Sequence, residues 1–196
     1  MANKLICVVG MAGSGKSEVS EYLKSKRKFG YVRFGQIVLD RVKELGGKTS
    51  EILERKVREE LRAEHGMAAM AKLNAPKIDK LILESDVIAD SIYSWEEYLF
   101  LKEKYLDELI IIAVYSAPKI RYNRLENRAE KHGPDPDLRF RSFPQTESKA
   151  RDYAEIENLH KAGPIVMADY TIINDNSVAS LQKQINKIIK EIWHTV

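Results

Sequence analysis

The sequence predicts an α/β fold in which a parallel sheet is covered by helices on both faces. Short apolar runs rich in β-branched residues recur along the chain, separated by longer segments with helical periodicity. The runs are LICVV at 5–9, YVRFG at 31–35, DVIAD at 86–90, LIIIAVY at 109–115 and YTIIN at 170–174. Continuously apolar strands joined by connections long enough to cross over are typical of parallel sheets that are buried on both faces.

Length and composition fit one domain that spans 1–196. Of the 196 residues, 44% are apolar and 31% are charged, so the chain can bury a substantial core. Lys and Arg number 32 against 29 Asp and Glu, and the resulting charge of +3 is too small to indicate binding to nucleic acids or membranes.

Other sequence features narrow the class of protein further. The longest apolar run, at 109–115, falls short of the ~18 residues that cross a bilayer, and the N-terminus does not follow the pattern of a signal peptide. Cys7 is the single cysteine, and the four histidines show no metal-binding spacing. We therefore expect a cytoplasmic protein that acts on a small molecule, without a membrane or nucleic-acid partner. The sequence leaves the oligomeric state open.

Helical periodicity predicts the first and the last helix of the chain. The first is predicted from Lys16 to about Lys26, directly after the first strand. The last follows Ser177, a predicted N-cap. We expect it to pack on the sheet through apolar residues at steps of three and four: Leu181, Ile185, Ile188, Ile189 and Ile192.

Two stretches between predicted strands are longer than the shortest crossover connection requires. About fifty residues between the second and third strands are largely helical and highly charged, with a narrow apolar stripe made by Leu53, Val57 and Leu61. Glutamates alternate there with three arginines for which we expect an exposed, solvated face: Arg55, Arg58 and Arg62. The second stretch, from 129 to 152, contains three prolines in HGPDPD and SFPQ, which are typical of a loop or a mobile arm.

The segment GMAGSGKS at 10–17 matches the pattern G-x-x-x-x-G-K-[ST] in full, between a predicted strand and a predicted helix. Glycines allow consecutive backbone N–H groups to point at phosphate oxygens, and the N-terminus of the helix adds its positive dipole end. Lys16 would reach the β- and γ-phosphates and Ser17 would offer a hydroxyl to magnesium. The predicted nucleotide-binding residues are Gly10, Met11, Ala12, Gly13, Ser14, Gly15, Lys16, Ser17 and Glu18.

This loop resembles that of nucleoside monophosphate kinases and dephospho-CoA kinases. VREELRAEHGMAAMAK at 57–72 is similar to a segment of an archaeal group related to adenylate kinase and dephospho-CoA kinase, and ADYTIINDNS at 168–177 to the stretch before the last helix of dephospho-CoA kinases. The resemblance implies a P-loop NTPase fold, a three-layer α/β/α sandwich with a five-stranded parallel sheet. It also implies a helical acceptor-binding insert at 36–80 and a lid at 129–152.

An aspartate at a strand end is the candidate for a second magnesium ligand, because Mg²⁺ prefers hard oxygen ligands. In DVIAD, Asp90 lies at the carboxyl end of the predicted strand, where ligands bind in parallel sheets, and Asp86 lies at the opposite edge. The alternative is that Asp90 caps the next helix, since Ser91, Ser94 and Glu96 follow it.

The chain departs from the resembling group at two positions. That group has an aspartate, a glycine, an apolar residue, an arginine and a serine where this chain reads Asp90-Ser91-Ile92-Tyr93-Ser94. Tyr93 can offer one neutral hydrogen bond where the arginine would bind acceptor phosphate. Gln36 occupies a position that is usually acidic in the group. We expect both changes to affect the chemistry at the acceptor more than the binding of the nucleotide.

Arginines near the predicted lid could stabilise the charge of a transferring phosphoryl group. Arg121, Arg124 and Arg128 are spaced at i, i+3 and i+7, so we expect them on one face of a helix leading into the lid. The resemblance makes Arg124 and Arg128 nucleotide contacts, and it likens Arg151 and Asp152 to a pair that closes the lid. In the alternative, this is a solvated face whose arginines pair with neighbouring glutamates.

The leading interpretation is an ATP-dependent kinase that transfers the γ-phosphoryl group of Mg-ATP to a small acceptor. A nucleoside monophosphate such as AMP is the first candidate and dephospho-CoA the second. The predicted catalytic residues are Lys16, Asp90, Arg124 and Arg128, and Ser17 and Asp90 would hold Mg²⁺. The alternative is a nucleotide-binding regulatory or switch protein with weak or no kinase activity.

Overall fold

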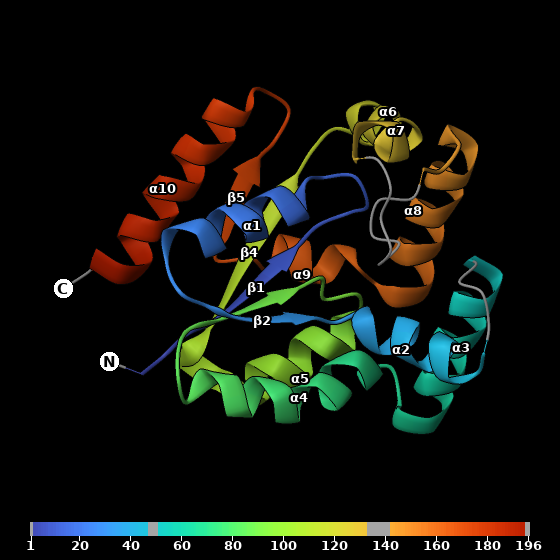
Figure 1. Cartoon of the computed structure of the whole chain (residues 1–196), viewed down its shortest axis with the longest axis horizontal. Helices are drawn as coiled ribbons and strands as arrows, with labels where there is room; N and C mark the ends of the chain where they lie inside the picture. Colours follow the sequence, from blue (N-terminus) through green and yellow to red (C-terminus); the bar gives the residue numbers. More distant parts are fainter. Residues whose placement is uncertain (1, 47–50, 133–141, 195–196) are drawn as a thin grey trace.

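A computed structural model describes residues 2–46, 51–132 and 142–194 of the chain (Figure 1). The predicted parallel sheet of five strands is confirmed, in the order β2–β3–β1–β4–β5. Its strands are β1 (Leu5–Val9), β2 (Gly30–Arg33), β3 (Val87–Asp90), β4 (Leu109–Tyr115) and β5 (Tyr170–Ile173). Each lies within one or two residues of a predicted apolar run.

Helices connect the strands and cover both faces of the sheet. They are α1 (Lys16–Lys26), α2 (Gln36–Glu44), α3 (Glu51–His65), α4 (Ala69–Ile82), α5 (Trp95–Tyr105), α6 (Pro118–Glu126), α7 (Arg128–His132), α8 (Gln145–Leu159), α9 (Ala162–Val166) and α10 (Val178–His194), with a 3₁₀ turn at Leu106–Glu108. None of these helices combines the length and the apolar character that crossing a bilayer requires.

The alternation of side chains along β1 divides the core into two layers. Ile6 and Val8 point to one face, where α1 and α10 pack, and Leu5 and Cys7 point to the other, where α4 and α5 pack (Figure 1). The last helix begins as predicted, because the Ser177 hydroxyl accepts a hydrogen bond from the Ser180 N–H at 3.3 Å. This arrangement is the predicted three-layer α/β/α sandwich.

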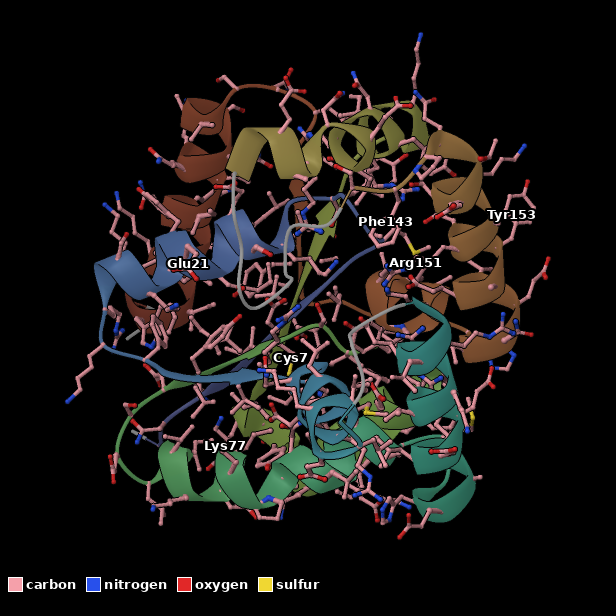
Figure 2. The ribbon with its side chains drawn as sticks, turned by 45° about the vertical axis from the view of Figure 1, so that its right-hand side comes forward. Cys7, Glu21, Lys77, Phe143, Arg151 and Tyr153 are labelled. Atoms are coloured by element: carbon pink, nitrogen blue, oxygen red, sulfur yellow. The ribbon has the colours of Figure 1, made fainter. Side chains whose placement is uncertain are left out.

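Three helices, α2, α3 and α4, connect β2 to β3. The predicted apolar stripe on α3 is confirmed, since Val57 is fully buried and both Leu53 and Leu61 pack against the same core. The third helix, α4, lies on the sheet itself and buries Ile78. Both α3 and α8 lie toward the end of the molecule to which the carboxyl ends of the strands point (Figures 1 and 2).

The predicted arm at 129–152 lies partly outside the described residues, which resume at 142. From Gln145 onward the chain is helical, so the expectation of a loop up to 152 is wrong there. Pro144 directly precedes this helix with an extended backbone. As the N-cap, Pro144 accepts the first helical hydrogen bond through its carbonyl, from the Ser148 N–H at 2.9 Å.

Candidate functional site

The phosphate loop runs from the end of the central strand β1 to the first turn of α1. In the sheet, Val8 is paired with Asp90 and Val9 with Ala113, so the loop starts between the carboxyl ends of β3 and β4. This is the edge at which open parallel sheets bind ligands. The helix begins at Lys16, as predicted.

Two glycines of the loop have a left-handed backbone and close neighbours. Gly13 has φ +77°, and a Cβ there would lie 2.7 Å from the carbonyl oxygen of Arg121. Gly15 has φ +98° and caps α1, and a Cβ there would overlap the amide of Asn174. Both positions therefore combine an unfavourable φ for other residues with a lack of space. The glycine pattern thus reflects the geometry of the loop in this structure.

Strand ends support the loop from behind. The Asn174 Nδ2 donates to the Ser14 carbonyl at 2.8 Å, and the Ser116 hydroxyl donates to the Asn174 carbonyl at 2.6 Å. Arg124 donates to the Ser116 hydroxyl at 2.9 Å and to the Asn174 carbonyl at 2.8 Å. Its predicted role as a nucleotide contact stays a prediction, and in this structure its guanidinium joins the ends of β4 and β5.

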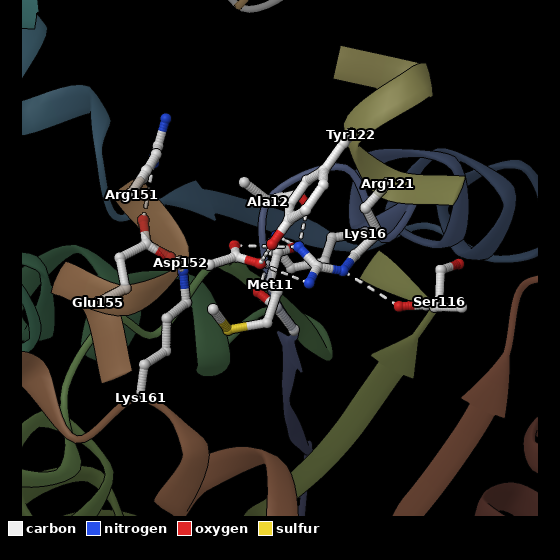
Figure 3. A network of polar contacts seen from close by, with 12 residues as sticks. Met11, Ala12, Lys16, Ser116, Arg121, Tyr122, Arg151, Asp152, Glu155 and Lys161 are labelled. Atoms are coloured by element: carbon white, nitrogen blue, oxygen red, sulfur yellow. Dashed lines mark hydrogen bonds and ion pairs between the residues drawn. The ribbon is translucent and has the colours of Figure 1, made fainter. Parts of the chain in front are cut away.

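Arg121 joins the phosphate loop to α8 (Figure 3). Its guanidinium is buried and makes a two-pronged ion pair with Asp152, at 3.0 and 2.5 Å. It also donates to the carbonyls of Ala12 at 3.0 Å and Ser116 at 3.1 Å, while the Tyr122 hydroxyl donates to Asp152 at 3.0 Å. The carbonyl and the N–H of a peptide point in opposite directions. Because the Ala12 carbonyl points toward Arg121, the Gly13 N–H points away from it and can face a phosphate.

Arg151 and Asp152, the residues that the resemblance likens to a lid-closing pair, bind different partners in this structure. Arg151 donates to Glu155 at 2.8 Å, one turn along α8, because consecutive helical residues do not face each other. The predicted common face of the three lid arginines is wrong. The chain leaves the helix at Asn127, so Arg128 begins the separate helix α7 while Arg121 and Arg124 remain on α6.

Lys16 is held by its own loop. The ammonium donates to the carbonyls of Gly10 at 3.0 Å and Met11 at 3.1 Å. Burial, followed by the nearby Lys161 ammonium, lowers the pKa of Lys16 to about 7. An anion at the loop would reverse both effects, because it would offset the lost hydration and the repulsion between the two cations.

Asp90 lies at the carboxyl end of β3, beside the phosphate loop, and Asp86 lies at the far edge, as predicted. The Asp90 carboxylate accepts hydrogen bonds from the hydroxyls of Tyr31 and Ser91, both at 3.0 Å. The alternative in which Asp90 caps the next helix is wrong, since Ser94 caps α5 by accepting from the Glu97 N–H. The hard oxygens of Ser17 and Asp90 are of the kind that fits Mg²⁺.

Two insert arginines depart from the expected solvated face. Arg55 is exposed and pairs with Glu59 at 2.9 Å, as that expectation predicts. Arg58 is only 24% exposed, and the Nε and Nη2 of Arg62 are buried without a hydrogen-bond partner among the described residues. Burial lowers the pKa of Arg62, which the Glu97 carboxylate partly offsets. These arginines face the interior because α3 packs against the core through its apolar stripe.

Near Arg62 the structure also holds a buried carboxylate that sequence reasoning missed. Glu97 is fully buried, and one of its oxygens accepts from the Tyr93 N–H at 2.7 Å. Its other oxygen has no hydrogen-bond partner in the described part of the chain. Burial raises the pKa of Glu97 to about 7. Gln36, the other position at which the sequence differs from the resembling group, donates a hydrogen bond to Asp40 at 2.9 Å on the same helix.

Residues 6–167 match the protein family described as an AAA domain. A UPF0200 protein from Thermococcus gammatolerans is 32% identical over 190 residues, which cover 96% of this chain and 95% of that protein. A shikimate kinase from Bacteroides thetaiotaomicron has a TM-score of 0.58 and 14% identity, over 97% of this chain and 98% of that one. A gluconokinase from Sinorhizobium meliloti has a TM-score of 0.55 and 12% identity, over 97% and 96%. Both kinases share the fold of this chain.

Proposed function

Since the chain belongs to the UPF0200 family of archaeal proteins and to the AAA domain family, with a P-loop kinase-like fold, we propose that it is a phosphotransferase. It transfers the γ-phosphoryl group of Mg-ATP to a small acceptor. The observation that carries the proposal is the phosphate loop, with left-handed Gly13 and Gly15 and the Ala12 carbonyl held by Arg121. This backbone geometry presents N–H groups to a polyphosphate.

In the proposed reaction, positioning and charge stabilisation lower the barrier, so no strong nucleophile from the protein is needed. Lys16 exchanges the carbonyls of Gly10 and Met11 for phosphate oxygens and stabilises the charge that moves with the phosphoryl group. Arg124 and Arg128 are the proposed further contacts to the nucleotide. Ser17 and Asp90 would hold Mg²⁺, which supplies charge neutralisation for the β- and γ-phosphates.

The acceptor binds, in this proposal, between the phosphate loop and the helices α3 and α8. Arg62, Arg151 and Lys161 contribute positive charge on this side, and Glu97 and Glu155 contribute carboxyl groups. An excess of cations favours an acceptor that carries its own negative charge. A nucleoside monophosphate such as AMP is therefore our first candidate, and dephospho-CoA is the second.

The experiment mixes the purified protein with Mg-ATP and each acceptor and follows the formation of ADP. The proposal predicts turnover that depends on one acceptor and disappears in Lys16→Ala. Lys24→Ala is the matched control, because Lys24 lies on the same helix but is partly exposed and pairs with Glu21 at 2.9 Å. This variant should retain wild-type turnover.

Two other results would contradict the proposal in different ways. ATP binding without any acceptor-dependent turnover would indicate the alternative, a nucleotide-binding regulatory or switch protein. Absence of ATP binding in calorimetry with Mg²⁺ present would exclude both functions.

A further inference from the structure

The turn between α8 and α9 carries a buried lysine that the loop motif does not explain. Lys161 is 2% exposed, and its ammonium donates to one oxygen of Glu155 at 2.5 Å. The other oxygen of Glu155 accepts from Arg151 at 2.8 Å, so a single carboxylate serves two cations (Figure 3). An ammonium has three donors, and among the described residues Glu155 is the only hydrogen-bond acceptor of this one.

Lys161 lies between the acceptor side and the phosphate loop. Its ammonium is 4.9 Å from the centre of the Tyr93 ring, and its charge contributes to the lowered pKa of Lys16. Figure 2 shows that Arg151 lies on the inner side of α8, whereas Tyr153 points outward from the same helix. Arg151 and Lys161 thus both donate to Glu155, which carries a single negative charge.

We propose that Lys161 binds an anionic group of the acceptor, and that this group is the phosphate of a phosphate monoester, which accepts the transferred phosphoryl group. A buried ammonium is unfavourable unless its charge and its donors are matched, and Lys161 shares the carboxylate of Glu155 with Arg151. A phosphate monoester dianion fits, since one oxygen can bind Lys161 while another attacks. This inference rests on the proposed function and assigns the substrate class of that site.

The transfer balances without a protein base. An oxygen of the acceptor phosphate dianion forms a bond to the γ-phosphorus of ATP. The bond from that phosphorus to the β–γ bridging oxygen breaks, and its electron pair leaves on ADP. The attacking oxygen carries no proton, so Lys161 acts by binding charge and not by proton transfer.

The test compares Lys161→Met, Lys161→Arg and Glu155→Gln with wild type, using Lys149→Met as a control on the exposed side of α8. Losing a charged hydrogen bond to phosphate should raise the KM for AMP by about 10- to 100-fold in Lys161→Met, with the Kd for ATP changed less than about 3-fold. Lys161→Arg should rescue most of this loss, and Lys149→Met should behave as wild type.

Glu155→Gln separates binding from a structural role. If Lys161 only neutralises Glu155, removing either partner should harm the protein alike. If Lys161 binds the acceptor, Glu155→Gln removes its competitor, so the KM for AMP should stay the same or fall. An unchanged KM in Lys161→Met, or a parallel rise in Glu155→Gln, would overturn the inference while leaving the proposed function intact.

Failure of the proposed function gives a different result. If no acceptor is turned over, the affinities for ATP and for diadenosine pentaphosphate, which spans donor and acceptor sites, are compared by calorimetry. If Lys161→Met loses affinity for the pentaphosphate but not for ATP, the result would still support an anion site at Lys161. Equal affinities of wild type and variant for the pentaphosphate would exclude it.

Discussion

The buried ion pair between Arg121 and Asp152 should contribute strongly to stability. The two side chains are only 5% and 6% exposed, and Asp152→Asn would place an amide N–H group against the guanidinium or the Tyr122 hydroxyl. Breaking a buried pair from one side costs about 3–5 kcal/mol, because the other charge stays buried. For a chain of this length, that loss lowers Tm by roughly 6–20 °C.

Calorimetric unfolding of four proteins measures this effect. Tyr122→Phe removes only a neutral donor to Asp152 and should cost about 1 kcal/mol. The double variant Arg121→Met/Asp152→Leu removes both charges, so it should regain more than half of the stability that Asp152→Asn loses. Its ATP affinity should nevertheless be lower than that of wild type, since the Ala12 carbonyl has lost its donor. Substitutions at the surface usually change the free energy of unfolding by less than about 0.5 kcal/mol. A change no larger than this in Asp152→Asn would refute the reasoning.

Three further predictions concern the loop and the buried acid. Gly15→Ala should weaken ATP binding and lower Tm because its Cβ would overlap Asn174, whereas Gly46→Ala, with φ +68° but open space, should leave binding unchanged; equal affinities in calorimetry would contradict this. Between pH 4.5 and 7, Glu97 keeps a proton in the folded protein that it has lost in the unfolded chain. The free energy of unfolding should therefore fall with rising pH, by up to about 1.4 kcal/mol per pH unit. Urea titrations of Glu97→Gln should no longer show this slope. At pH 8, ATP should restore the charge of Lys16 and take up protons, which makes the calorimetric enthalpy depend on the buffer; a buffer-independent enthalpy would count against the lowered pKa.

Local signals were sufficient for much of the fold. The five apolar runs lie where the strands lie, and the helix that follows the loop begins and ends as its periodicity predicts. The rule that ligands gather at carboxyl ends of parallel strands placed Asp90 beside the loop and Asp86 away from it. The same rule could have identified Asn174, which follows the fifth strand and supports the loop.

The partners of charged side chains could not be read from spacing. Asp152 stands next to Arg151 in the chain, yet it pairs with Arg121 because α6 and α8 pack against each other. Arg62 has the sequence context of a solvated helix, but the packing of α3 buries part of its guanidinium. Lys161 and Glu155 are six residues apart across a helix end, and the left-handed backbone of His160 at that end accompanies their approach. These contacts depend on tertiary packing, which local sequence patterns do not report.

The contacts of Lys16 with Gly10 and Met11 have a consequence for selectivity. The two hydrogen bonds from Lys16 already organise the loop, so a ligand need not first order the backbone. Any ligand must nevertheless replace two intramolecular hydrogen bonds before it gains from the ammonium. A nucleotide whose phosphate chain is too short to reach Lys16 would leave those bonds in place and forgo that gain. The loop would thereby discriminate among nucleotides by the length of their phosphate chain.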